Sequence, residues 1–132
     1  MKKLIKVVGA IIENNEHEIL CALRSPKMSM PNHFEFPGGK IENGESYKKA
    51  IEREIREELN CKVEFNSIFN ENVYDYGDFI VSLTTAKCSL ISGTPTADEH
   101  SKLIWLKREN LKSLVWAPAD VVAVEELIEE KV

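Results

Sequence analysis

Three glutamates that follow a glycine-rich turn give this sequence its clearest potential for chemistry. The turn is Gly38–Glu45, and the glutamates lie in the segment Arg53–Leu59. In an α-helix, which advances about 100° per residue, Glu54, Glu57 and Glu58 fall within an arc of roughly 100°. Carboxylates at these spacings repel each other, and hard divalent cations such as Mg²⁺ bind carboxylates together with substrate phosphates. For an arbitrary helix such a pattern favours a solvated acidic face, and a metal site is the alternative.

The surroundings of the glutamates favour the metal site. Their arc borders an apolar arc formed by Ile51, Ile55 and Leu59. The glutamates are therefore expected at the edge of the core instead of opposite to it. Arg53 stands four residues before Glu57 and can orient that carboxylate, which leaves Glu54 and Glu58 unpaired within the helix.

The spacing of the turn and the helix resembles the Nudix box, the signature of hydrolases that act on nucleoside diphosphates linked to another group. Gly39, Glu45 and the run Arg53–Glu58 match the signature. Asn60 and Cys61 stand where the signature ends in glycine and an aliphatic residue. Asparagine tolerates the left-handed conformation at the end of a helix, and a buried cysteine behaves as a small hydrophobe.

This resemblance implies the Nudix fold, of class α/β (α+β): a mixed β-sheet sandwiched between helices, with a loop–helix–loop catalytic motif. It implies Mg²⁺ as the cofactor, with Mn²⁺ as a substitute. The metal ligands it implies are the Gly38 carbonyl, Glu54, Glu57, Glu58 and Glu99, the last just before a strand that bears Trp105. Glu54 would be the general base, Glu45 an alternative base or a structural member of the box, and Arg53 would hold the glutamates in place.

A second group of residues would bind the substrate. The run Phe34–Gly39 resembles that of MutT-like members, in which one phenylalanine stacks on the base; plain core packing is the alternative for both Phe34 and Phe36. Arg24 and Lys40 would contact phosphates, although single basic residues are also common surface charges. Gly39 belongs to the glycine turn, whose backbone can approach the substrate closely.

The run Trp116–Asp120 resembles the Ala-Pro-Ala-Asp segment of CTP pyrophosphohydrolase-like members. Asp120 would then recognise the base; the alternative is an aspartate favoured by the dipole at a helix N-terminus. For His100, a solvated loop histidine is the favoured interpretation over a proton carrier.

Together these features predict a Mg²⁺-dependent nucleoside triphosphate pyrophosphohydrolase that gives a monophosphate and pyrophosphate. The substrate would be 8-oxo-dGTP or a (d)CTP-type nucleotide, in a nucleotide-pool sanitising role. One rival is a hydrolase of dinucleoside polyphosphates or capped RNA, because Tyr74 and Tyr76 lie where some such relatives keep a tyrosine. The other is a catalytically weak nucleotide-sensing module, which would be expected to lose box carboxylates that are present here.

The composition is that of a small enzyme. The 132 residues suit one domain, 1–132, and the net charge of −5 argues against binding to a nucleic acid polymer. The three cysteines lack metal or disulfide spacing and indicate a reducing compartment. No signal peptide or membrane span is recognised, so we expect a cytoplasmic monomer or homodimer.

The elements that must position these residues follow a mixed α/β order. Strands are predicted at residues 3–13, 18–24, 33–36, 62–74, 78–91 and 102–106, the second as the hairpin partner of the first. Helices are predicted at 46–59, with Ser46 as the N-cap, and at 119–131, with Pro118 in the first turn.

Overall fold

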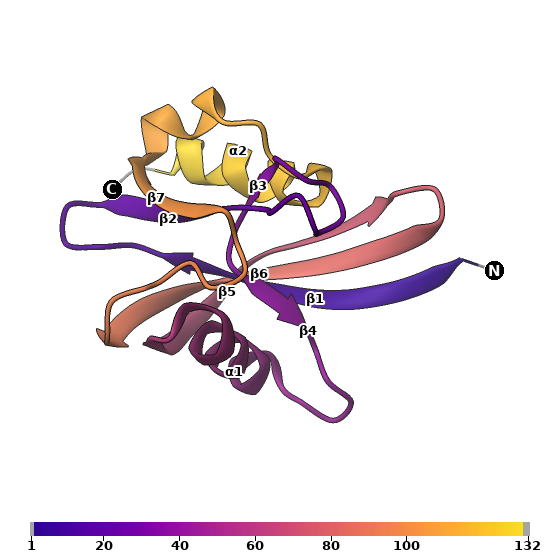
Figure 1. Cartoon of the computed structure of the whole chain (residues 1–132), viewed down its shortest axis with the longest axis horizontal. Coiled ribbons are helices and arrows are strands. Elements are labelled where there is room, and N and C mark those ends of the chain that lie inside the picture. The colour runs from indigo at the N-terminus through magenta and orange to yellow at the C-terminus, as the bar shows by residue number, and fades with distance from the viewer. Residues whose placement is uncertain (1, 131–132) are drawn as a thin grey trace.

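The computed structural model describes residues 2–130, which form two sheets and two α-helices (Figure 1). The elements are β1 (Lys3–Ile12), β2 (Glu18–Leu23), β3 (Phe34–Glu35), β4 (Gly38–Lys40), α1 (Tyr47–Leu59), β5 (Lys62–Asp75), β6 (Phe79–Ser92), β7 (Lys102–Lys107), the 3₁₀ helices η1 (Arg108–Ser113) and η2 (Pro118–Asp120), and α2 (Val121–Glu129). The predicted strands and helices are confirmed, with ends that differ by one or two residues. Lys131, the predicted end of the last helix, lies outside the described residues. The short elements β4 and η1 were not predicted.

The larger sheet is mixed and has the order β4-β1-β6-β5. Strand β1 runs parallel to β6 and antiparallel to β4, and β5 is antiparallel to β6. The smaller sheet, β3-β2-β7, is antiparallel. The predicted hairpin of β1 with β2 is wrong, since the two strands belong to different sheets and are linked at their turn by an isolated bridge from Glu13 to Ile19. Strand β6 pairs along one edge of β1 and β4 pairs with Val7–Gly9 on the other, whereas β2 pairs with β3 and β7.

The two α-helices cover opposite sides of the larger sheet (Figure 1). On β1, Val8, Ala10 and Ile12 pack in the same apolar cluster as the buried face of α1, whereas Ile11 packs in the cluster of α2. This alternation is the period of two expected for a strand buried on both faces. The layers match the predicted mixed sheet between helices. No helix within residues 2–130 is long and apolar enough to cross a membrane.

The ends of α1 follow the signals in the sequence. The Ser46 hydroxyl accepts a hydrogen bond from the Lys49 amide at 3.2 Å, as expected for an N-cap. Asn60 ends the helix in the left-handed conformation, with φ 54° and ψ 35°. Both predictions for these positions are confirmed. The capping residues therefore set where α1 begins and ends, and so where its glutamates lie.

Candidate active site

Helix α1 brings its three glutamates to the edge of the core, but into different surroundings. Its buried residues are Ala50, Ile51, Ile55 and Leu59. The side chain of Glu54 is 13% exposed and that of Glu57 is 53% exposed. Glu58 is half-buried, and its Oε2 is a buried oxygen without a hydrogen-bond partner within residues 2–130. The sequence spacing gives no reason to expect different exposures for these three side chains, but in the fold their exposures differ.

The buried glutamates hold their protons more tightly than free carboxyl groups do. Burial, followed by the negative charge of Glu54, raises the pKa of Glu58 to about 7. Glu99, on the exposed loop before β7, contributes to the same rise through its negative charge. Burial also raises the pKa of Glu54, against the opposing effect of Arg53. This part of the site is therefore short of positive charge.

Arg53 organises the rest of the acidic cluster. Its Nε and Nη2 donate to the two oxygens of Glu45 at 2.6 and 2.8 Å, and these bonds are the first cause that lowers the pKa of Glu45 to about 2. Its Nη1 donates to Glu57 at 3.0 Å and to Glu54 at 3.2 Å. The prediction that Glu54 is unpaired within the helix is therefore wrong. The Arg53 guanidinium binds Glu45 of the preceding turn and the adjacent Glu54 at the same time. Glu58 has no such partner among the described residues.

Two glycines let the β4 backbone approach these carboxylates. A Cβ on Gly39 would collide with the Glu54 carboxylate, and a Cβ on Gly38 would collide with the Val8 carbonyl of β1. Only glycine fits at both positions without a shift of the neighbour. The β4 backbone is thus held directly beside the carboxylate of Glu54.

A ready-made metal cage is absent from the described part of the chain. Within residues 2–130, no three His, Cys, Asp or Glu side chains are grouped closely enough to hold a metal ion. Arg53 takes up Glu57 and one oxygen of Glu54, which are two of the predicted ligands. The loop of Glu99 is fastened to the end of α1, where the Asn60 amide donates to Asp98 at 2.5 Å and to Thr96 at 3.2 Å.

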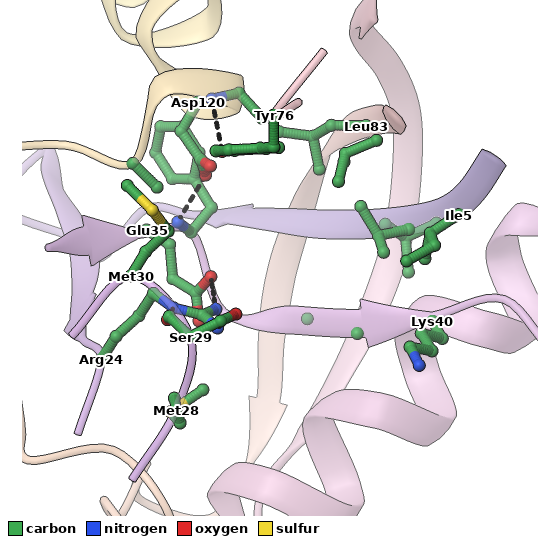
Figure 2. Close-up of a pocket in the computed structure, with 18 of the residues that line it drawn as sticks. Ile5, Arg24, Met28, Ser29, Met30, Glu35, Lys40, Tyr76, Leu83 and Asp120 are labelled. Atoms are coloured by element: carbon green, nitrogen blue, oxygen red, sulfur yellow. Dashed lines mark hydrogen bonds and ion pairs between the residues drawn. The ribbon is translucent and has the colours of Figure 1, made fainter. Parts of the chain in front are cut away.

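A cavity of about 340 Å³ is lined by Glu58 of the acidic cluster and by Asp120 (Figure 2). Figure 2 shows Asp120 next to Tyr76, and Lys40 apart from both on β4. The predicted residues that line it are Arg24, Phe36, Gly38, Gly39, Lys40, Glu58 and Asp120. Apolar side chains of β1 and β6 form another part of the wall, including Ile5, Val81 and Leu83. Charged and apolar side chains thus line one cavity.

Arg24 is already engaged by protein groups at the cavity wall. Its Nη1 donates to Glu35 Oε1 at 2.6 Å, and its Nε and Nη2 donate to the carbonyl and hydroxyl of Ser29. The other oxygen of Glu35 bonds to His100 Nε2 at 2.8 Å. His100 has a side chain only 1% exposed, so its interpretation as a solvated loop histidine is wrong. Glu35, which links these residues, was not singled out from the sequence, although a charge between two buried phenylalanines is a usable signal.

Both phenylalanines of the predicted base site pack in the core. Phe34 and Phe36 are 9% and 3% exposed, with ring centroids 6.4 and 5.0 Å from that of Trp116. Phe36 also lines the cavity, whereas Phe34 is absent from the lining within residues 2–130. The Phe34 backbone bonds to Val115 and Ala117 and so docks this segment against β3.

Asp120 is a buried acid in the wall of the cavity. It is 5% exposed, and its Oδ2 accepts a hydrogen bond from the Phe36 amide at 3.0 Å. Burial, followed by the charge of Glu35, raises the pKa of Asp120 to about 8. At neutral pH the group is therefore mostly protonated and can both donate and accept hydrogen bonds.

Comparison with known proteins identifies relatives that match almost the whole chain. The sequence model of the NUDIX domain matches residues 3–129. The CTP pyrophosphohydrolase of Escherichia coli (strain K12) is 34% identical over 123 residues, which cover 93% of this chain and 90% of that protein. The 8-oxo-dGTP diphosphatase of the same strain is 33% identical over 127 residues, which cover 96% and 98%.

A solved structure shows the same fold. The solution NMR structure of a MutT protein of the Nudix hydrolase family, from methicillin-resistant Staphylococcus aureus 252, is 47% identical with a TM-score of 0.80. The match covers 99% of this chain and all of that one. The family and the fold predicted from the sequence are confirmed.

Proposed function

The chain belongs to the NUDIX domain family of hydrolases, and we propose that it cleaves nucleoside triphosphates to monophosphate and pyrophosphate with the help of a divalent metal ion. The observation that carries this proposal is the buried Glu58 Oε2, which has no partner among residues 2–130 and stands beside a cavity long enough to join it to Asp120. A buried carboxylate without a partner is unfavourable unless it takes up a proton, as its raised pKa allows, or a cation compensates its charge.

The donor set fits a hard divalent cation. The residues that would hold it are Glu54, Glu57, Glu58, Glu99 and the carbonyl of Gly38, all of them oxygen donors. Glu57 is exposed enough to turn from Arg53 toward such an ion. When bound, Mg²⁺ or Mn²⁺ would neutralise the triphosphate and make a water molecule more acidic. Both rivals stay open to test: a dinucleoside polyphosphate or capped-RNA hydrolase, and a nucleotide-sensing module.

The protein's own groups would divide the remaining work. Glu54 is our candidate for the general base, because its raised pKa brings it nearer to the pH at which it must accept a proton. Glu45 suits a structural role better, since Arg53 occupies both of its oxygens and its pKa is lowered to about 2. Arg53 would hold the cluster, and Lys40 at the cavity rim is placed to contact phosphates.

The catalytic assignment is tested by two substitutions and one labelling experiment. Glu54→Gln and Glu57→Gln should each lower kcat by orders of magnitude, with unchanged circular dichroism. Hydrolysis in ¹⁸O-water should label the monophosphate if water attacks the α-phosphorus. Near-normal turnover in either variant would remove that residue from the scheme, and label in pyrophosphate would contradict the attack position.

Asp120 is our candidate for recognition of the base. A protonated carboxyl presents a donor beside an acceptor, and it can pair with a base edge that also carries both. Cytosine and 8-oxoguanine each offer such an edge, which agrees with the two substrate types in the names of the similar E. coli enzymes.

A substrate panel tests the proposed function directly. Initial rates with Mg²⁺ should be compared for 8-oxo-dGTP, dGTP, CTP, dCTP and 5-methyl-dCTP, with Ap₄A and a capped RNA as the rival substrates. We expect a triphosphate to be the best substrate and the rate to require the metal. Faster hydrolysis of Ap₄A or capped RNA would favour the first rival. Tight nucleotide binding without turnover would favour the sensing module.

A further inference from the structure

We propose that Tyr76 and Asn72 of the β5 region form a peptide clamp that positions Asp120 and thereby sets the preference among bases. The clamp is defined by two hydrogen bonds to one residue, Ala119. The Tyr76 hydroxyl accepts from the Ala119 amide at 3.0 Å, and the Asn72 amide donates to the Ala119 carbonyl at 3.1 Å. This inference rests on the proposed role of Asp120 in base recognition.

The clamp acts on a segment that has little regular structure of its own. Asp120 is the last residue of η2, a 3₁₀ helix of three residues that is too short to be rigid alone. Its amide bonds to the Ala117 carbonyl at 2.9 Å, and its Oδ2 is fixed by the Phe36 amide. Ala119 is held at both its amide and its carbonyl by residues of β5 and the turn after it, and the Asp120 side chain is held by the residue that follows β3.

Tyr76 is itself held in place. Its ring stacks on Phe79, with centroids 5.4 Å apart and planes at 25°, and lies 4.7 Å from the ring of Tyr74. Its amide bonds to the Phe79 carbonyl across the turn that contains Gly77, whose φ is +99°. The hydroxyl is thus presented to Ala119 by a rigid ring, and Figure 2 shows Tyr76 beside Asp120 at one end of the cavity.

The clamp is expected to affect recognition of the base by Asp120 and not the cleavage of the phosphates. A small misplacement of Asp120 would weaken its bonds to the correct base edge more than bonds to a wrong one. The phosphate end of the cavity, which belongs to β4 and α1, would be unaffected. Loss of the clamp should therefore lower discrimination between bases and raise KM for the preferred one, with little change in kcat.

Tyr76→Phe is the clean test, because it removes one oxygen and keeps the stacked ring. The ratio of kcat/KM between the best and the worst base of the panel should fall by about threefold to tenfold, as expected for one lost hydrogen bond. Asn72→Ala should act in the same direction and serves if Tyr76→Phe does not fold. Tyr74→Phe is the matched control: its ring lies outside the cavity lining within residues 2–130, and the ratio should stay at the wild-type value.

A double-mutant cycle separates positioning from direct contact. If Tyr76 acts through Asp120, Tyr76→Phe should have no further effect on the ratio in an Asp120→Ala protein. An undiminished effect in that background, or an unchanged ratio in both clamp variants, would overturn the clamp.

A failure of the proposed function can be distinguished from a failure of the clamp. If the wild-type protein hydrolyses none of the triphosphates, the proposed function is wrong, and the clamp is tested by the dissociation constants of 8-oxo-dGMP, dGMP and CMP. The same loss of discrimination is then expected in Tyr76→Phe. A wild-type protein that binds all three equally would overturn the clamp as well.

Discussion

Replacing Glu58 with glutamine should stabilise the metal-free protein and abolish its hydrolysis. Burial and nearby carboxylates raise the pKa of Glu58 from 4.5 to about 7. Between these values the native protein binds more protons than the unfolded chain, so the free energy of unfolding falls as the pH rises. At about 1.4 kcal/mol per pH unit, the full loss is about 3 kcal/mol. Glutamine never ionises, and we expect a gain of about 1–3 kcal/mol above pH 7.

Denaturant unfolding followed by circular dichroism measures this gain. With EDTA present, wild type and Glu58→Gln should differ above pH 7 and converge near pH 4.5, where the wild-type carboxyl is neutral as well. When Mg²⁺ is added in place of EDTA, the free energy of unfolding should rise for wild type but not for the variant, because only wild type binds Mg²⁺ well. The control is Glu125→Gln, an exposed glutamate of α2 that should match wild type in every condition.

Two results would refute this reasoning. A variant less stable than wild type above pH 7 would mean that the Glu58 carboxylate has a favourable partner in the native protein. Equal stabilisation of wild type and variant by Mg²⁺ would mean that Glu58 is not a ligand. Either result would remove the observation on which the proposed function depends.

Three further predictions concern the surroundings of the metal ligands. Gly39→Ala should displace the Glu54 carboxylate and lower kcat about a hundredfold or more, with a native circular dichroism spectrum. Arg53→Lys keeps the charge but not the paired geometry, and it should lower kcat by about tenfold or more and the free energy of unfolding by about 1–2 kcal/mol, measured by urea unfolding. Asn60→Gly keeps the left-handed conformation but loses the bond to Asp98, which fastens the loop of a predicted metal ligand. The Mg²⁺ concentration for half-maximal activity should therefore rise about threefold. The free energy of unfolding should stay within about 0.5 kcal/mol of the wild-type value.

Local features of the fold could be predicted from the sequence because their causes are local. The limits of α1 follow from Ser46 and Asn60, and both residues act as their side chains suggest. Strand pairing depends on residues far apart in the chain. Strand β1 pairs with β6 about seventy-five residues later, a partner that no adjacent turn announces. The predicted hairpin of β1 with β2 failed for this reason.

The same limit applies to the candidate site. The grouping of the α1 glutamates could be predicted from the sequence because all of them lie on one helix, where spacing alone fixes which residues share a face. The environment of His100 depends on Glu35, which lies sixty-five residues away and reaches it from another strand. Likewise, the Ala119 peptide is held by side chains from β5 and the turn after it. Such contacts come from tertiary packing, and neither hydrophobic periodicity nor a short motif contains them.

Burial, not spacing, distinguishes a metal site from a solvated acidic face on α1. The acidic face explains Glu57, which is exposed and paired with Arg53. It does not explain Glu58, whose Oε2 is buried without a partner in the described residues, since a carboxylate placed only for solubility would remain in water. Nor does it explain the glycine backbone that lies directly against the Glu54 carboxylate. Both features cost stability in the free protein, and a bound cation with its phosphate ligand would offset that cost.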